Sequence, residues 1–175
     1  MSLVLRRAAI FLAVIVAGAL LAAVVANSAT FERDVVSFAG FAPGTIVVKT
    51  GERRLYYVID EARALRFPVG VGRSGKTWSG STRVEGKYLR PDWQPPEEIR
   101  REHPGLPQVI RGGAADNPMG AAALTLRGGE YAIHGTNRPA SIGGFVSYGC
   151  IRMHNRDIVE LYRLVDIGTP VIVER

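Results

Sequence analysis

The chain contains a single cysteine, Cys150, which stands in a glycine-containing turn, Ser147-Tyr148-Gly149-Cys150. Upstream of it, His134 ends an alternating apolar run and is followed at once by Gly135, so we expect this histidine at a strand end. The thiolate is the reactive form of cysteine, and an imidazole that accepts the thiol proton generates it. Because a strand end is a rigid mount, the two residues predict a cysteine nucleophile with His134 as its general base.

A lone cysteine can also be a small buried apolar residue, and that alternative competes for Cys150. Several features favour the nucleophile. Gly143, Gly144 and Gly149 permit the unusual backbone angles of a turn that exposes a side chain and directs its amides at a ligand. Arg152 could supply positive charge near the thiol. In an exported protein, moreover, an unpaired thiol is exposed to oxidation and needs a function to explain it.

His134-Gly135 and Ser147-x-Gly149-Cys150-Ile151-Arg152-Met153 together resemble the signature of L,D-transpeptidase catalytic domains of the YkuD type. The resemblance extends from about Thr45 to the C-terminus. It implies a mainly β, sandwich-like catalytic domain with one main helix after the cysteine loop. One position departs from the pattern, since Tyr148 stands where many family members carry histidine. Further matches are Gly112-Gly113, Asn117-Pro118-Met119-Gly120 and Gly168-Thr169-Pro170-Val171.

The resemblance also implies the reaction and its partners. The donor would be a peptidoglycan tetrapeptide stem, cleaved before its terminal D-Ala, and the acceptor would be an amine of another stem or of a wall-anchored lipoprotein. Acylation by carbapenems would be expected, and the chemistry requires no metal and no organic cofactor. Two alternatives remain open: an L,D-carboxypeptidase that uses water as the acceptor, and a non-catalytic module that binds the cell wall.

Roles for the remaining residues follow from the same site. The resemblance assigns the carbonyl of Gly135 to the orientation of the imidazole. A glycine-lined turn can direct the N–H groups of Gly149 and Cys150 at one oxyanion. Arg152 would either hold the loop in place or bind a substrate carboxylate. Further candidates for substrate binding are Ser147, Tyr148 and Asn137.

A metal site is the other chemistry that these residue types suggest. Its ligands would be His134, Cys150 and His154. Cys150 and His154 are close in the sequence, but there is no second close pair of ligands, and a structural zinc requires four. We therefore expect no metal, and we expect His154 to be a residue at the start of the helix.

Composition and charge limit the partners of the chain. The 175 residues suffice for one domain and a targeting segment. A formal charge of +6 suits an acidic partner, but the basic residues are scattered and form no nucleic-acid-binding module. We therefore expect no nucleic acid, whereas an anionic cell-wall polymer or a membrane surface fits.

The N-terminal segment indicates export. Arg6-Arg7 precede an uncharged apolar run over 8–26, and small residues follow. We therefore expect residues 1–29 to be a signal peptide or, because the run is just long enough to span a bilayer, a membrane anchor. Either alternative places the remainder in the periplasm or cell envelope, with the membrane contacted only through this segment. A single cysteine also excludes an intramolecular disulfide.

The remaining elements would position the site. We expect a linker over 30–43 and a catalytic domain over 44–175. β-Branched and aromatic residues favour strands at 45–49, 55–59 and 64–69, joined by short turns, and a second hairpin whose far strand, 131–133, leads to His134. The long stretch 70–120 reads as irregular, apart from one helical turn at 97–102.

One helix is well supported by periodicity. We expect it to follow the cysteine loop with Asn155 as its cap, because Ile158, Leu161, Tyr162 and Val165 recur at helical spacing. Its apolar face would pack on the sheet and hold the Cys150 loop. A final strand is expected at 170–173.

Overall fold

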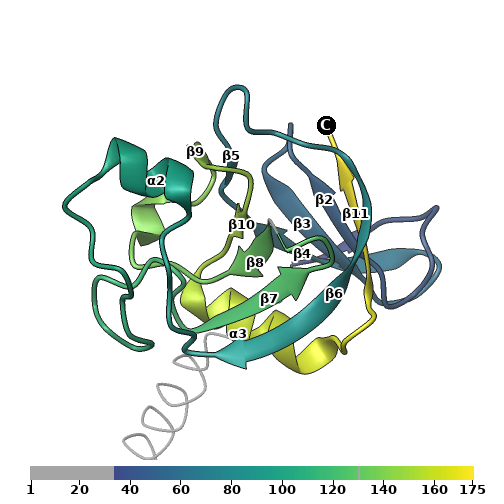
Figure 1. Cartoon of the computed structure of the whole chain (residues 1–175). Coiled ribbons are helices and arrows are strands. Elements are labelled where there is room, and N and C mark those ends of the chain that lie inside the picture. Colours follow the sequence, from purple (N-terminus) through teal and green to yellow (C-terminus); the bar gives the residue numbers. More distant parts are fainter. Residues whose placement is uncertain (1–33, 130) are drawn as a thin grey trace, which may run out of the picture. The chain divides into compact units, whose positions relative to one another are not determined.

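The computed structural model describes residues 34–129 and 131–175 (Figure 1). The predicted signal peptide or anchor at 1–29 and the first residues of the predicted linker lie outside this part. Within the two described ranges, no helix is long and apolar enough to cross a membrane.

Strands make up most of the regular structure. The described elements are, in chain order, β1 (Val35–Ser37), β2 (Ile46–Lys49), β3 (Arg54–Val58), β4 (Arg63–Pro68), β5 (Val71–Gly72), β6 (Gly80–Leu89), α2 (Glu97–Glu102), β7 (Ala122–Leu126), β8 (Ala132–His134), the 3-10 turn η1 (Pro139–Ser141), β9 (Phe145–Ser147), β10 (Ile151–Arg152), α3 (Asn155–Leu164) and β11 (Pro170–Glu174).

Nine of these strands form one mixed sheet in the order β1-β4-β3-β2-β11-β6-β7-β8-β10, and β5 and β9 form a separate parallel pair. β11 lies inside the large sheet, parallel to β2 and antiparallel to β6. The predicted mainly β class is therefore confirmed. The predicted hairpins β2–β3–β4 and β7–β8 are confirmed as well, as are the helical turn α2 and the final strand.

The long strand β6 connects the two halves of the sheet. Its first residues, Gly80 to Arg83, pair with β11, whereas those from Val84 to Leu89 pair with β7. The register shifts between Val84 and Gly86, and a bulge of this kind bends a strand. Figure 1 shows β6 curving from β11 to the edge of β7.

This strand corrects the prediction that 70–120 is irregular. Among the ten residues of β6 only Val84 and Gly86 are buried, so the strand carries almost no apolar signal of its own. Its conformation is fixed by backbone pairing with β11 and β7, which are distant in sequence.

The main core lies between the two halves of the sheet. Ile46 and Val48 of β2 pack in one cluster with residues of β7, β8 and β10. The helix α3 adds Ile158, Leu161 and Val165 to the same cluster, as its periodicity predicts, and Figure 1 shows it running beneath β7 and β8. The prediction of Asn155 as the helix cap is wrong, because the cap position is occupied by the preceding residue and Asn155 is the first residue of α3.

A second apolar cluster covers the opposite face of β2 and β3. Val47 and Tyr56 belong to it, and Phe38 and Phe41 pack against it. The Phe38 ring stacks on that of Tyr56, with 4.2 Å between the ring centroids. Phe38 and Phe41 come from the segment 30–43 that we predicted as a linker, and β1 in the same segment pairs with β4. Its described part is thus packed against the sheet.

Candidate active site

His134 is the last residue of β8 and is held by a strand on either side. Its register neighbours are Ala123 of β7 and Arg152 of β10, and 4% of its surface is exposed. Nδ1 lies 2.7 Å from the carbonyl oxygen of Gly135. A carbonyl only accepts hydrogen bonds, so Nδ1 carries the proton of the neutral ring and Nε2 keeps its lone pair. This is the contact with Gly135 that the resemblance implies, and it leaves Nε2 available as a base.

The peptide group that contains the Gly135 carbonyl is fixed by Asn155. The Asn155 Oδ1 accepts hydrogen bonds from the N–H of Thr136 at 2.9 Å and of Ala121 at 3.0 Å, and its Nδ2 donates to the Thr136 carbonyl at 2.9 Å. A Cβ atom on Gly135 would come within 2.2 Å of Asn155 Oδ1. Only glycine therefore allows this approach, and the side chain predicted to cap the helix instead secures the segment that orients His134.

The loop before Cys150 rests on a pair of aromatic rings. Gly149 has φ of 124°, and a Cβ atom there would lie 2.2 Å from the Tyr131 ring. Tyr131 stacks on Trp78, with 5.0 Å between the ring centroids and 9° between the planes. The indole N–H of Trp78 donates a hydrogen bond of 2.9 Å to the Gly149 carbonyl. The glycine is thus required by its backbone angle and by the ring that covers it.

Ser147 closes the turn that presents the cysteine. Its hydroxyl donates to the Cys150 carbonyl at 2.6 Å and accepts from the Gly149 N–H at 3.1 Å. The Gly149 N–H is one of the two predicted oxyanion donors, but in this structure it is bonded to Ser147. It would have to exchange that partner for a substrate oxygen, whereas the Cys150 N–H remains a predicted donor.

Burial is the main influence on the protonation of His134, the predicted base. The pKa of His134 is lowered to about 4, first by burial and next by the positive charge of Arg152. The carbonyl groups of Gly135 and Pro118 act in the opposite direction. The imidazole is therefore neutral at pH 7 and can accept a proton.

The predicted nucleophile is also neutral at rest. Burial raises the pKa of the Cys150 thiol above its ordinary value, although a hydrogen bond from the Ala132 backbone and the charge of Arg152 oppose this. The resting site thus contains a thiol and an imidazole rather than a thiolate and an imidazolium.

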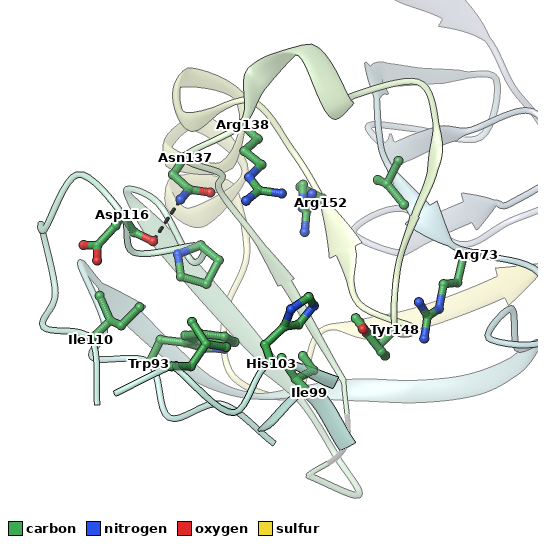
Figure 2. Close-up of a pocket in the computed structure, with 13 residues that line it drawn as sticks. Arg73, Trp93, Ile99, His103, Ile110, Asp116, Asn137, Arg138, Tyr148 and Arg152 are labelled. Atoms are coloured by element: carbon green, nitrogen blue, oxygen red, sulfur yellow. Dashed lines mark hydrogen bonds between the residues drawn. The ribbon is translucent and has the colours of Figure 1, made fainter. Parts of the chain in front are cut away.

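Cys150 and His134 line one cavity of about 460 Å³, together with Ser147, Tyr148 and Arg152. A volume of this order suits a small ligand or a peptide segment. Of the predicted site residues, Asn137 lies outside this cavity. It lines a neighbouring cavity of about 430 Å³, to which Tyr148 and Arg152 also contribute (Figure 2).

Like Ser147, the other three predicted binding residues are already engaged with the protein. The Asn137 side chain donates to the Asp116 carbonyl at 2.8 Å, as Figure 2 shows. Arg152 donates from Nη1 to the Ser141 hydroxyl at 3.0 Å. The Tyr148 hydroxyl is hydrogen-bonded to the Glu102 carboxylate.

The short helix α2 forms a wall of both cavities, because Ile99 lines each of them. Two ion pairs attach α2 to the loop after β5. Arg73 contacts Glu102 at 2.7 Å, and Lys76 contacts Glu98 at 2.5 Å. The Arg73 guanidinium also lies 4.0 Å from the centroid of the Tyr148 ring. Tyr148 thus joins the cysteine loop to this wall.

The alternative metal site does not form from the described residues. No group of three or more His, Cys, Asp or Glu side chains within 34–129 and 131–175 is placed to hold a metal ion. His154 is the cap residue of α3 and lines neither cavity.

The sequence pattern does not reveal the roles of three residues that shape the site, Asn155, Trp78 and Arg138. The pattern assigns Asn155 to the helix cap, Trp78 belongs to the stretch that reads as irregular, and Arg138 stands in no motif. The available signal in the sequence is the two glycines that these contacts require. Asn155 lies close to Gly135, and Tyr131, on which Trp78 stacks, lies close to Gly149.

Residues 43–173 match the YkuD family, described as the L,D-transpeptidase catalytic domain. The chain therefore belongs to the L,D-transpeptidase family of enzymes. The probable L,D-transpeptidase ErfK/SrfK of Escherichia coli K12 is 42% identical to it over 133 residues. That match covers 72% of this chain and 42% of the E. coli protein, so the chain spans less than half the length of this relative.

Two solved structures show the same fold. The catalytic domain of the E. faecium L,D-transpeptidase, acylated by ertapenem, is 20% identical, and the match covers 77% of this chain and 99% of the domain with a TM-score of 0.57. A Brucella melitensis structure described as a probable carnitine operon oxidoreductase is 34% identical. That match covers 82% of this chain and 94% of the Brucella chain, with a TM-score of 0.55.

Proposed function

We propose that this protein is a peptidoglycan L,D-transpeptidase in which Cys150 forms an acyl-enzyme with a tetrapeptide stem and releases D-Ala. The observation that carries the proposal is the placement of Cys150 and His134 in one cavity, with Nδ1 of His134 bonded to the Gly135 carbonyl. A thiol that shares a cavity with an oriented neutral imidazole is suited to acyl transfer rather than to the oxidoreductase activity that the description of the Brucella protein names.

The proton moves during the attack rather than before it. Since the imidazole and the thiol are both neutral at rest, Nε2 of His134 takes the thiol proton as Cys150 Sγ bonds to the substrate carbonyl. The resulting imidazolium is stabilised by the Gly135 carbonyl, and it returns the proton to the departing amine of D-Ala. The Cys150 N–H is the proposed donor to the oxyanion, joined by that of Gly149 if it leaves Ser147.

The second half of the reaction transfers the acyl group to an amine. We infer that the acceptor is the side-chain amine of another stem, giving a 3→3 cross-link, or an amine of a wall-anchored lipoprotein. An L,D-carboxypeptidase, with water as acceptor, uses the same residues and is the second candidate. A non-catalytic cell-wall-binding module is the third, and the presence of nucleophile, base and Arg152 together argues against it.

The substrate suggests the location. Peptidoglycan stems lie outside the cytoplasmic membrane, and the basic and apolar N-terminal segment fits export to the periplasm or cell envelope. We propose that the catalytic part acts there, with the N-terminal segment removed or retained as an anchor.

The experiment that tests the function compares the protein with its Cys150→Ala and His134→Ala variants. Each is incubated with purified disaccharide-tetrapeptide, and the products are measured by mass spectrometry. We expect cross-linked dimer and free D-Ala from the parent, none from Cys150→Ala, and acylation slowed by about 10²–10⁴ in His134→Ala.

The other outcomes discriminate between the candidates. Tripeptide and D-Ala without dimer would establish the carboxypeptidase. Turnover that survives in Cys150→Ala would overturn the assignment of the nucleophile. If the folded parent releases no D-Ala, the binding module becomes the better explanation. Acylation by a carbapenem, followed as a mass increase on Cys150, gives a readout that does not depend on the acceptor.

A further inference from the structure

Arg138 and Arg152, from different segments of the chain, both line the cavity beside the one that contains Cys150. Arg138 precedes the turn η1, and Arg152 ends β10, two residues after Cys150. Both line the cavity of about 430 Å³, and Arg152 also lines the cavity that contains Cys150. Figure 2 shows the two side chains next to each other at one end of this cavity.

The charges of these two arginines are not balanced by the described part of the protein. Neither forms an ion pair with a carboxylate of residues 34–129 or 131–175, and Arg152 Nη1 donates only to a neutral hydroxyl, that of Ser141. Partial burial and, next, the positive charge of Arg138 lower the pKa of Arg152, so the two guanidinium groups are close enough to repel each other. Other arginines do have partners: Arg73, which lines the same cavity, pairs with Glu102, and Arg111, which follows the lining residue Ile110, pairs with Asp92.

Asp116, an acidic residue that lines this cavity, does not form an ion pair with either arginine. Asp116 lines the cavity, and its backbone carbonyl accepts the hydrogen bond from Asn137. In Figure 2 its carboxylate points away from Arg138, toward the outside of the loop. A pair of guanidinium groups without a carboxylate favours an anionic ligand, because a planar guanidinium matches a carboxylate with two parallel hydrogen bonds.

We propose that Arg138 and Arg152 form a subsite for a carboxylate of the substrate stem peptide. The inference rests on the proposed function and extends it from the bond that is cleaved to the group that is recognised. Arg152 lines both cavities, so a peptide carbonyl beside Cys150 Sγ can belong to the same ligand as a carboxylate between the two arginines. The sequence leaves two roles open for Arg152, holding the loop and binding a substrate carboxylate. Both can apply, because its hydrogen bond to Ser141 holds the side chain while its guanidinium lines the cavity.

Two carboxylates of a stem peptide could occupy the subsite. One is the terminal carboxylate of D-Ala. The other is the second carboxylate of the diamino acid, which diaminopimelate has and lysine lacks. Three tetrapeptides separate them: one with diaminopimelate, one with lysine in its place, and one with diaminopimelate that ends in D-alaninamide.

The test measures binding without turnover. The Cys150→Ala protein is titrated calorimetrically with the three peptides, alone and with Arg138→Gln or Arg138→Lys added. Arg163→Gln is the matched control, because Arg163 is exposed near the end of α3 and lines neither cavity. For the peptides that carry the recognised carboxylate, we expect Arg138→Gln to raise the Kd about tenfold. For the peptide that lacks this carboxylate, the Kd should not change. Arg138→Lys should retain part of the affinity.

Failure of the subsite and failure of the function give different results. D-Ala release by the Cys150 enzyme is measured in parallel with the diaminopimelate peptide. If D-Ala is released but Arg138→Gln binds all three peptides like its parent, the subsite is wrong and the function stands. An equal loss in Arg163→Gln would show a general effect of charge and would also overturn the subsite. If no peptide binds and no D-Ala appears, the proposed function itself fails.

Discussion

His134 and Asn155 hold opposite ends of one peptide group. The carbonyl of the Gly135–Thr136 peptide is bonded to His134 Nδ1, and the N–H of the same peptide is bonded to Asn155 Oδ1. A peptide group is planar and rigid, so fixing the N–H also fixes the direction of the carbonyl. Asn155, the first residue of α3, therefore positions the proposed base His134 without touching it.

We predict that Asn155→Ala lowers kcat/KM by about 10- to 100-fold, because a misdirected general base loses much of the effect that its position confers. The specific readout is the ¹⁵N NMR spectrum of His134. The parent should show a single tautomer with the proton on Nδ1, and the variant a mixture. Asn137→Ala is the control, since it also removes an amide bonded to a backbone carbonyl and should leave the tautomer unchanged. An unaltered tautomer in Asn155→Ala would refute the positioning role.

The protonation of the nucleophile can be measured without substrate. Since burial raises the pKa of Cys150, the rate of alkylation by iodoacetamide should rise with pH through and above the range of an ordinary thiol, with no plateau near neutrality. Arg152→Gln should move this rise to still higher pH, because the positive charge of Arg152 favours the thiolate. Arg163→Gln should not shift it. A plateau beginning near pH 7 would indicate a preformed thiolate and imidazolium.

The buried His134 should make folding sensitive to acid. Its pKa is about 4 in the folded protein and about 6.5 in an unfolded chain, so the unfolded state binds more protons between these values. The contribution to stability is present above pH 6.5 and is lost as the pH falls toward 4, by an amount on the order of 3 kcal/mol. Urea unfolding from pH 7 to pH 4 should show a steeper loss for the parent than for His134→Gln. Parallel losses would mean that His134 is protonated in the folded protein.

A comparison of alanine substitutions at Gly149 and Gly143 tests whether the Tyr131 ring constrains the cysteine loop. Both have positive φ, 124° and 88°, but a Cβ atom at Gly143 meets nothing within 4 Å, whereas one at Gly149 would strike the Tyr131 ring. We predict that Gly143→Ala costs about 1–2 kcal/mol of stability from backbone strain alone. Gly149→Ala should cost clearly more and should also reduce acylation. Equal melting temperatures for the two variants would show that the aromatic pair does not constrain the loop.

Much of the fold is predictable because its signals are local. The hairpins β2–β3–β4 and β7–β8 have short turns between β-branched or aromatic runs, and α3 has an apolar stripe that recurs at helical spacing. β6 escapes prediction for a physical reason: only two of its residues are buried, and its pairing partners are far away in the chain.

In the site as well, the features that depend on neighbouring residues are predictable, and those that depend on distant contacts are not. Cys150 and His134 are recognisable from residue type and glycine context, and the bond to the Gly135 carbonyl connects adjacent residues. Asn155, Trp78 and Arg138 act through contacts across the fold, and no spacing rule describes these. The assignment of Asn155 to a cap fails because its side chain bonds to two loops brought to it by the sheet rather than to its own helix.

The place of β11 within the large sheet has a consequence for how the chain folds. The last strand lies between β2 and β6, so the segment around Ile46 finds its parallel partner only at Val171. Contacts of such long sequence separation form slowly, because a large loop must close first. During synthesis the two halves of the sheet would remain separate, with unpaired edges, until the C-terminal residues become available. Removal of Pro170–Glu174 would leave the proposed catalytic residues in the chain but divide the sheet that holds them.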